Sequence, residues 1–212
     1  MERYQETFET WNKVAKLYED KFMNLDLYND TYDEFCSLLF NREPTVLEIG
    51  CGPGNITKYL LSKRPDFKIE AIDVSENMIM LARINNPSVN FNQLDCRKID
   101  KIKNKFDGIV CGFCLPYLSE HDCKKLIKDF TAITSESAII YLSFVEGESN
   151  ESGYQVGNNG DRVFFYYHQT DNLKSILNKN GFTLINLFHK SYVKNDHSNE
   201  LHTILIAKKS AC

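Results

Sequence analysis

Ten residues in the first third of the chain, 46–55, join an embedded carboxylate to three alternate glycines. The stretch begins as a short apolar strand that contains Glu48 and then turns through Gly50, Gly52 and Gly54. Because glycine tolerates positive φ and has no side chain, such a loop lets a ligand lie against bare backbone at the end of a strand. Open α/β sheets bind nucleotides at this position.

A second carboxylate, Asp73, ends the next apolar run, at about the 20-residue spacing expected of a group that binds ribose hydroxyls. Glycine loop, helix, strand and acid together predict one βαβ unit that binds an adenosine moiety. A glycine-rich turn can also be a plain connection between a strand and a helix. The carboxylates on both sides of the loop favour the binding interpretation.

The spacing of the glycines distinguishes between adenosine derivatives. A dinucleotide fingerprint reads Gly-x-Gly-x-x-Gly, whereas here the third glycine comes one position early and Asn55 takes its place. Glu48 would repel a phosphate but could attract an ammonium group, which S-adenosylmethionine carries in place of pyrophosphate. An acid, one apolar residue and Gly-x-Gly-x-Gly resemble the first motif of the class I S-adenosylmethionine-dependent methyltransferases.

Later segments extend this resemblance over about residues 45–208 and imply roles for single residues. The segment 106–113 resembles the fourth strand of that family and the loop that lines the methionine end of the cofactor. By resemblance, Asp73 binds the ribose, Val74 and Met78 flank the adenine ring, Asp95 reads its amino group, and Cys96 supplies the adjacent backbone. Without the resemblance, a cysteine at the end of a strand is more typical of a small buried residue that fills space in the core. The predicted cofactor site comprises Glu48, Gly50, Gly52, Gly54, Asn55, Asp73, Val74, Met78, Asp95, Cys96, Gly112 and Phe113.

One departure from the family concerns catalysis. Many small-molecule members carry a histidine just after the fourth-strand loop, where this chain has Leu115, Pro116 and Tyr117. An orienting or catalytic group is therefore not assigned there.

The elements that must position these residues alternate along the chain. Such alternation predicts a parallel sheet covered on both faces, and the resemblance adds an antiparallel closing pair. We therefore expect one methyltransferase domain, residues 1–212, with a Rossmann-like seven-stranded mixed sheet, mainly parallel with an antiparallel carboxy-terminal strand, and helices on both faces. The expected strands are 45–49, 68–72, 89–94, 106–111, 137–144, 181–185 and 201–208, and the expected helices about 55–63, 76–85, 120–131 and one that ends at Gly181.

The amino-terminal part, residues 1–42, is expected to form a helical lid over the cofactor-binding core, 45–144. Six residues recur at intervals of 4, 3, 4, 3 and 4, which places them on one face of a single helix. These are Tyr4, Phe8, Trp11, Ala15, Tyr18 and Phe22. A second helix is expected at about 31–40. Aromatic residues at helical spacing are more often core than ligand-binding, which is the alternative for Phe8 and Trp11.

The acceptor is expected to lie between this lid and an insertion, residues 145–168, that follows the fifth strand. The predicted acceptor-binding residues are Tyr18, Phe22, Tyr117, Tyr166 and His168. Tyr18 and His168 are the candidates for orienting the acceptor or taking its proton, because each has a polar tip and histidine titrates near neutrality. The insertion can also be a hairpin that only covers the end of the sheet. A closing helix and antiparallel strands, 169–212, complete the chain.

Composition excludes several classes of partner. The formal net charge of −4, from 25 basic and 29 acidic residues, gives no broad footprint for nucleic acid. Seven cysteines without an apolar leader indicate a reducing cytoplasm, and no apolar run is long enough to span a membrane. Cys111 and Cys114 have the spacing of a redox dithiol but lack a helix amino terminus to activate them, and no metal site is expected. We expect a monomer or homodimer.

The sequence therefore predicts methyl transfer from S-adenosylmethionine, with S-adenosylhomocysteine as product, to a small-molecule acceptor. A general base is needed only if the acceptor must lose a proton, and the sequence identifies none. Two alternatives stay open. An NAD-dependent oxidoreductase should show the later glycine and would have no use for Glu48. A non-catalytic protein that binds an adenosine ligand would keep every motif and lack only an open acceptor pocket.

Overall fold

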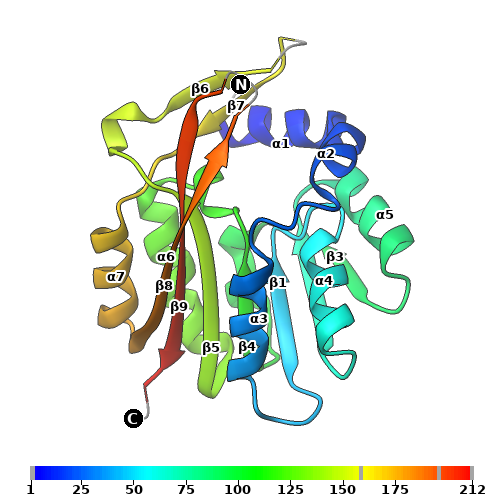
Figure 1. Ribbon diagram of the computed structural model, residues 1–212, viewed down its shortest axis with the longest axis vertical. Coiled ribbons are helices and arrows are strands. Elements are labelled where there is room, and N and C mark those ends of the chain that lie inside the picture. Colours follow the sequence, from blue (N-terminus) through cyan, green and yellow to red (C-terminus); the bar gives the residue numbers. More distant parts are fainter. Residues whose placement is uncertain (1–2, 158–159, 195–196, 211–212) are drawn as a thin grey trace.

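The computed structural model describes residues 3–157, 160–194 and 197–210, so Asn158, Asn159 and Cys212, which the sequence analysis covered, lie outside the described residues. A seven-stranded sheet in the order β3-β2-β1-β4-β5-β9-β8 forms its centre (Figure 1). The strands are β1 (Thr45–Ile49), β2 (Lys68–Asp73), β3 (Asn90–Gln93), β4 (Phe106–Cys111), β5 (Thr134–Val145), β8 (Phe182–Val193) and β9 (Asn199–Lys209). The first five pair in parallel, and β9 runs antiparallel to both of its neighbours, which confirms the predicted sheet.

Helices cover both faces of the sheet because the strands carry apolar residues on both sides. On β1, Leu47 packs in one core cluster with α6 and α7, whereas its neighbour Val46 packs in the other with α3, α4 and α5. Successive side chains of a strand point to opposite faces, so one short strand supports two cores. The helices are α3 (Asn29–Leu38), α4 (Asn55–Lys63), α5 (Glu76–Asn85), α6 (Glu120–Ile133) and α7 (Thr170–Lys179).

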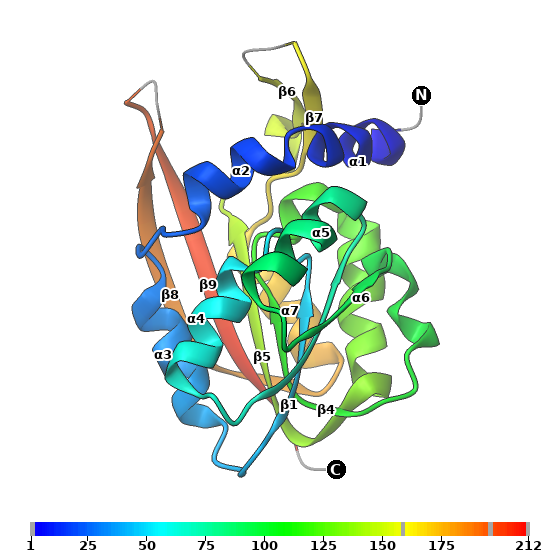
Figure 2. The same cartoon turned by 90° about the vertical axis from the view of Figure 1, so that its right-hand side faces the viewer.

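The amino-terminal segment forms two helices, α1 (Arg3–Lys13) and α2 (Ala15–Phe22), and the prediction of one helix is wrong at Val14. Val14 has φ −96° and ψ 13°, outside the helical range, and its branched side chain is stiff in a helix. Figure 2 shows α1 and α2 crossing the carboxyl end of the sheet. The bend lets α1 pack on β7 (Arg162–Phe165) and α2 pack on α5.

The segment between β5 and α7 forms a separate hairpin in which β6 (Gly153–Val156) pairs antiparallel with β7. This hairpin lies within the predicted insertion and does not join the main sheet. Its backbone is held by the lid: Phe164 N donates to Thr7 Oγ1 (3.1 Å), and Thr10 Oγ1 donates to Arg162 O (2.8 Å). Three short 3-10 helices, η1 (Cys96–Lys101), η2 (Leu115–Tyr117) and η3 (Ser149–Glu151), complete the elements.

Across the residues that the structure describes, no helix combines the length and apolar character needed to cross a membrane.

Candidate active site

The glycine loop after β1 takes the left-handed backbone conformation at all three glycines. Gly50, Gly52 and Gly54 have φ of 70°, 53° and 82°, a region that side chains with Cβ disfavour. The start of the loop is fixed to the end of β2, because Gly50 N and Cys51 N both donate to Ile72 O (2.8 and 3.0 Å). The loop therefore exposes backbone rather than side chains at the carboxyl end of the sheet.

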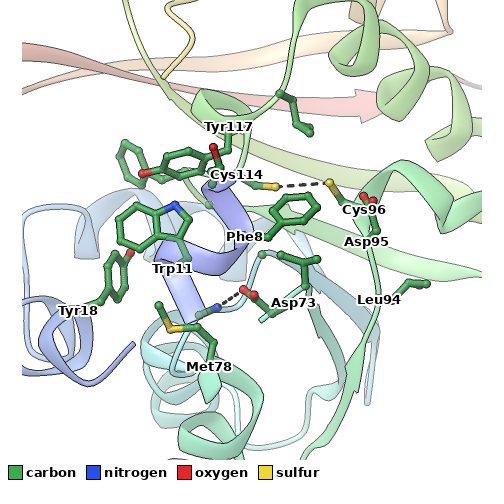
Figure 3. Close-up of a pocket in the computed structure, with 17 residues that line it drawn as sticks. Phe8, Trp11, Tyr18, Asp73, Met78, Leu94, Asp95, Cys96, Cys114 and Tyr117 are labelled. Atoms are coloured by element: carbon green, nitrogen blue, oxygen red, sulfur yellow. Dashed lines mark hydrogen bonds between the residues drawn. The ribbon is translucent and has the colours of Figure 1, made fainter. Parts of the chain in front are cut away.

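Asp73, at the end of β2, faces this loop. One carboxylate oxygen accepts a hydrogen bond from Gly52 N at 2.9 Å (Figure 3), and the other accepts from Ser75 N at 2.9 Å. Burial raises the pKa of Asp73, and the backbone donors oppose that rise. A carboxylate oxygen has more than one lone pair, so the same group can also accept from a ligand hydroxyl.

Glu48 is buried, with 1% of its surface exposed, two residues before the first glycine. Thr57 Oγ1 donates to one carboxylate oxygen, while Oε1 is buried and has no hydrogen-bond partner among the described residues. Burial raises the pKa of Glu48 to about 8. A buried acceptor without a donor is costly, and an ammonium group would both pair with Oε1 and favour the ionised carboxylate.

A first cavity opens over the loop and contains nine of the twelve predicted cofactor residues. They are Gly50, Gly52, Asp73, Val74, Met78, Asp95, Cys96, Gly112 and Phe113. Glu48 and Gly54 are not among the lining residues, and Gly54 instead caps α4, where Asn86 Nδ2 donates to its carbonyl (3.0 Å). Asn55 lines a neighbouring cavity rather than this one.

The lid helices form the roof of the first cavity and supply residues that the motifs did not identify. Trp11 stands edge-on between Tyr18 and Tyr117, with ring centroids 5.4 and 5.2 Å away (Figure 3). Trp11 Nε1 is buried without a partner in the described part of the chain. Among the other lining residues not predicted as cofactor-binding are Thr7, Phe8, Leu94, Cys114 and Leu118. The aromatic spacing of the lid was the available signal for Phe8 and Trp11, and both line the cavity.

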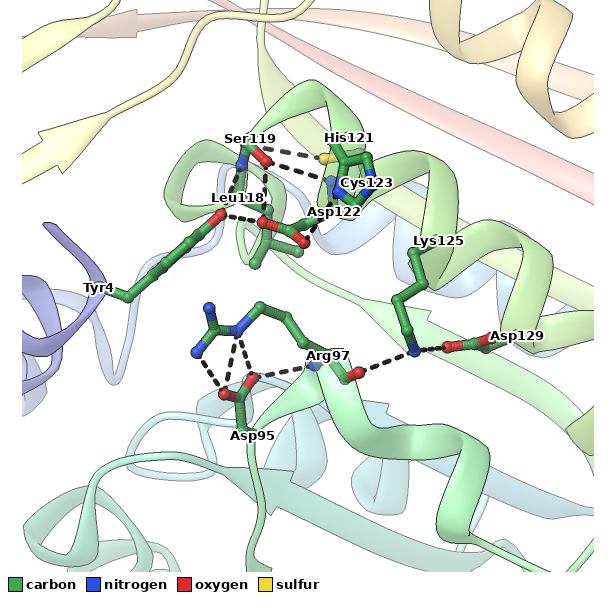
Figure 4. Close-up of polar contacts among 10 residues, drawn as sticks. All are labelled: Tyr4, Asp95, Arg97, Leu118, Ser119, His121, Asp122, Cys123, Lys125 and Asp129. Carbon is green, nitrogen blue, oxygen red and sulfur yellow. Dashed lines mark hydrogen bonds and ion pairs between the residues drawn. The ribbon is translucent and has the colours of Figure 1, made fainter. Parts of the chain in front are cut away.

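Asp95 is held by an ion pair that the sequence analysis did not foresee. Both of its carboxylate oxygens contact the guanidinium group of Arg97, at 2.6 to 3.0 Å (Figure 4). Arg97 in turn lies 4.0 Å from the ring centroid of Tyr4, whose hydroxyl donates to Asp122. An adenine amino group would have to share Asp95 with Arg97.

The two cysteines that line the first cavity, Cys96 and Cys114, are thiols whose pKa values are raised. Cys96 Sγ and Cys114 Sγ are 3.8 Å apart, and their mutual hydrogen bond together with burial holds the pKa of Cys96 well above its usual value. Cys114 precedes η2, which has only three residues, so the dithiol spacing with Cys111 lacks the helix that would activate it. Within the described ranges, no group of three or more His, Cys, Asp and Glu residues could hold a metal ion.

A second cavity adjoins the first and shares part of its wall. The residues common to both are Trp11, Tyr18, Gly50, Gly112, Phe113 and Tyr117. Phe22 lines only the second cavity, so three predicted acceptor residues, Tyr18, Phe22 and Tyr117, come together there. Residues that the sequence analysis missed complete the wall, among them Tyr28, Tyr192, Glu200 and His202.

The remaining two predicted acceptor residues, Tyr166 and His168, line a third cavity, so the structure does not bring them together with Tyr18, Phe22 and Tyr117. His168 is 6% exposed, and its Nε2 lies 2.9 Å from Leu115 O. Burial lowers the pKa of His168. This histidine therefore connects the insertion to η2.

Comparisons with known proteins agree with this geometry. A sequence model of a methyltransferase domain matches residues 46–136. An uncharacterized methyltransferase of Schizosaccharomyces pombe is 30% identical over 115 residues, which cover 52% of this chain and 77% of that protein. The release factor glutamine methyltransferase of Fusobacterium nucleatum is 27% identical over 179 residues, 80% of this chain and 48% of that protein. The chain spans about half the length of several curated relatives that it matches.

Among solved structures, the magnesium protoporphyrin IX methyltransferase of Synechocystis PCC 6803, crystallised with S-adenosylmethionine, superposes with a TM-score of 0.70. The match covers 99% of this chain and 98% of that one at 16% identity. At this identity the likeness shows a shared fold.

Proposed function

This chain belongs to the class I S-adenosylmethionine-dependent methyltransferases, and we propose that it transfers the methyl group of S-adenosylmethionine to a small-molecule acceptor bound in the second cavity. The observation that carries the proposal is the shared wall between the two cavities. It would bring a methyl donor in the first cavity against an acceptor in the second. A non-catalytic binding protein would lack that second, open cavity.

The residues that line the first cavity, together with Glu48 buried two positions before Gly50, fit the cofactor at each of its ends. Glu48 would hold the amino group through its unpartnered Oε1, and the positive-φ loop would let the methionine portion approach the backbone at Gly52. Asp73 would accept from the ribose, and Val74 and Met78 would flank the adenine. When bound, the cofactor supplies an activated methyl group on a sulfonium. NAD would place a phosphate near Glu48, which disfavours the oxidoreductase alternative.

Placement and exclusion of water are the contributions of the protein. Trp11, Tyr18 and Tyr117 stand between the two cavities and would hold an acceptor near the methyl carbon. The lid helices α1 and α2 cover this region, and a closed roof excludes water from the reacting atoms. In this proposal residues 3–22 act as the lid, the segment 45–144 as the cofactor-binding core, and the hairpin β6–β7 as a support for the lid.

The choice of a small molecule rests on the aromatic lining of the second cavity. One relative is named for a protein acceptor, release factor, so a protein substrate is the competing acceptor class. A protein acceptor needs a long groove, whereas here α1 and the hairpin pack on each other and both contribute side chains, Trp11 and Phe165, to the wall of the cavity.

Calorimetry followed by a transfer assay tests the proposal. We expect the protein to bind S-adenosylmethionine and S-adenosylhomocysteine but not NAD, and to label small metabolites, rather than proteins, from a methyl-labelled cofactor. Binding of NAD alone would contradict the proposed cofactor. Labelling confined to proteins would contradict the proposed acceptor class.

A further inference from the structure

The wall of the second cavity holds a hydrogen-bonded chain of three polar side chains drawn from opposite ends of the sequence. Tyr28 Oη lies 2.6 Å from His202 Nδ1, and His202 Nε2 lies 3.4 Å from Glu200 Oε2. Tyr28 and His202 are buried, with 5% and 6% of their surfaces exposed. All three residues line the cavity beside the cofactor pocket.

The hydrogen bonds among Tyr28, His202 and Glu200 define the direction in which a proton can move. Glu200 is ionised, because the hydrogen bond from His202 and the ion pair with Lys194 (3.2 Å) hold its pKa below the usual value. An ionised carboxylate accepts from His202 Nε2–H, which leaves Nδ1 as the basic nitrogen. Burial raises the pKa of Tyr28, so its hydroxyl keeps its proton and donates it to Nδ1.

Aromatic rings fix the imidazole of His202 in place. Tyr192 stacks on it at 4.9 Å with an angle of 10° between the rings, and Phe113 packs at 4.9 Å from another side. Phe113 itself has φ of 52°, which costs free energy for a residue with a side chain, and its ring borders both cavities. A strained residue that packs on the histidine between donor and acceptor sites indicates a functional constraint.

We propose that the second cavity takes an aromatic acceptor with an ionisable O–H or N–H group, and that Tyr28, His202 and Glu200 receive its proton. This inference rests on the proposed methyl transfer. The acceptor atom uses a lone pair to bond the methyl carbon, the carbon–sulfur bond breaks, and its electron pair remains on sulfur. The acceptor proton passes to Tyr28 Oη as the Tyr28 proton passes to His202 Nδ1, and Glu200 stabilises the imidazolium.

Charged groups near Tyr28, His202 and Glu200 support this direction of proton transfer. Lys194 pairs with Glu200, and Lys21 lies over the rings of Phe22 and Tyr192 at 4.9 and 6.0 Å, on the same cavity wall. Because Glu200 balances the charge of Lys194, Lys21 leaves the wall with a net positive charge, which favours the anionic form of an acceptor. Flat aromatic side walls favour a flat apolar body.

The probe for this inference is 4-nitrophenol, whose anion is coloured, added to the protein saturated with S-adenosylhomocysteine. At the pH where half of the free phenol is ionised, we expect the bound phenol to be predominantly anionic. His202→Gln and Tyr28→Phe should each remove this enrichment and weaken phenol binding about tenfold. The methyl ether 4-nitroanisole, which has no proton to lose, should bind all the proteins equally.

His189→Gln is the matched control, because His189 pairs with Thr203 on the opposite face of the same strand pair. Unchanged affinity for S-adenosylhomocysteine confirms that each variant is folded. If the parent protein itself does not bind S-adenosylhomocysteine, the proposed function is refuted rather than the relay. Equal anion enrichment in the parent and in Tyr28→Phe, which keeps the ring, would overturn the relay. Failure of both nitro compounds to bind would overturn the aromatic acceptor class.

Discussion

The two cavities, which we propose as the cofactor half and the acceptor half of the site, are built in different ways. The first cavity uses short segments between residues 50 and 118 of the core, together with the roof formed by the lid. The second cavity brings residues of α2 and the start of α3 against β8 and β9, so that Tyr28 and His202 meet across 174 positions of sequence. Most of one half is encoded in a continuous stretch of the core that begins with a βαβ unit, whereas the other half exists only after the whole chain has folded.

The two halves also differ in the kind of group that contacts the ligand. The cofactor half offers backbone at positive φ and carboxylates at strand ends, whose positions follow from the geometry of parallel sheets. The acceptor half offers side chains, such as Tyr28 and His202, on elements whose backbone would tolerate many residues. Backbone-encoded binding is therefore shared across a family, whereas the choice of acceptor depends on individual side chains.

Gly52→Val should produce the largest effect, a loss of S-adenosylhomocysteine binding of at least about 100-fold. Gly52 has φ of 53°, and a Cβ there would lie 3.6 Å from Tyr18 Cε1, inside the first cavity. A β-branched residue is strained in this conformation, and its side chain would fill the space beside the loop. Calorimetry measures the affinity, and a melting curve measures the fold.

Gly181→Val is the control for backbone strain alone, because Gly181 has φ of 77° and a Cβ there would meet no atom of the described residues within 4 Å. We expect it to lower the melting temperature and leave the affinity unchanged. Equal affinity of Gly52→Val and the parent would mean that the glycine loop does not contact the cofactor.

Glu48→Gln should weaken binding of S-adenosylhomocysteine by about 10- to 100-fold, the value of a hydrogen bond to a charged group. The same change should raise the free energy of unfolding at alkaline pH, an effect opposite in sign to the loss of binding. The pKa of Glu48 in the folded protein is about 8, above its ordinary value of 4.5, so its stabilising contribution is present below about 4.5 and lost as pH rises through about 8. A glutamine has no proton to lose.

Urea denaturation at pH 6 and pH 9 checks this second effect. We expect the free energy of unfolding to fall less between the two pH values in Glu48→Gln than in the parent. Glu76→Gln, in the exposed first turn of α5, should behave like the parent. Identical pH dependence in all three proteins would show that Glu48 is not buried as a neutral acid.

The same contrast explains how much of the molecule could be predicted from sequence. The parallel part of the sheet and its helices follow from periodicity, and Gly50 and Asp73 occur where the geometry of a βαβ unit requires them. The antiparallel closing pair and most of the nine predicted residues that line the first cavity came from the resemblance to the methyltransferase family. His202 could not be found in this way, because its partner Tyr28 lies in another element and no local pattern links them. His168 was predicted from its polar tip, but that tip lies 2.9 Å from the buried carbonyl of Leu115, a contact that sequence cannot show.

Asp73→Asn should have a smaller effect, a loss of about tenfold in affinity for adenosine. Asparagine keeps an oxygen that can accept from Gly52 N or Ser75 N, so the loop should keep its shape while the charge that favours ribose hydroxyls is removed. Binding of adenine, which has no ribose, should not change. If adenine and adenosine lose affinity equally, Asp73 supports the loop and does not bind the ribose.

Asn12→Ala should have the smallest effect, because it weakens the closure of the lid and leaves every contact of the core in place. Asn12 Oδ1 accepts from Asn77 N (2.9 Å) and Ser75 Oγ (3.0 Å), which ties α1 to the start of α5 beside Asp73. Two neutral hydrogen bonds are worth about 1–3 kcal/mol together, part of which is recovered by water when the lid opens. We therefore expect S-adenosylhomocysteine to dissociate about three- to tenfold faster, with the rate of association little changed.

The chain contains one tryptophan, Trp11, which lies in the roof of the first cavity, so its fluorescence reports opening and closing directly in a stopped-flow experiment. Gln5→Ala is the matched control, since Gln5 lies on the same helix and its side chain bonds only Glu9 among the described contacts. An unchanged dissociation rate in Asn12→Ala would mean that aromatic packing of Trp11 against Tyr117, rather than the bonds to α5, keeps the lid closed. That outcome would assign the lid to the acceptor half of the site, because Tyr117 also lines the second cavity.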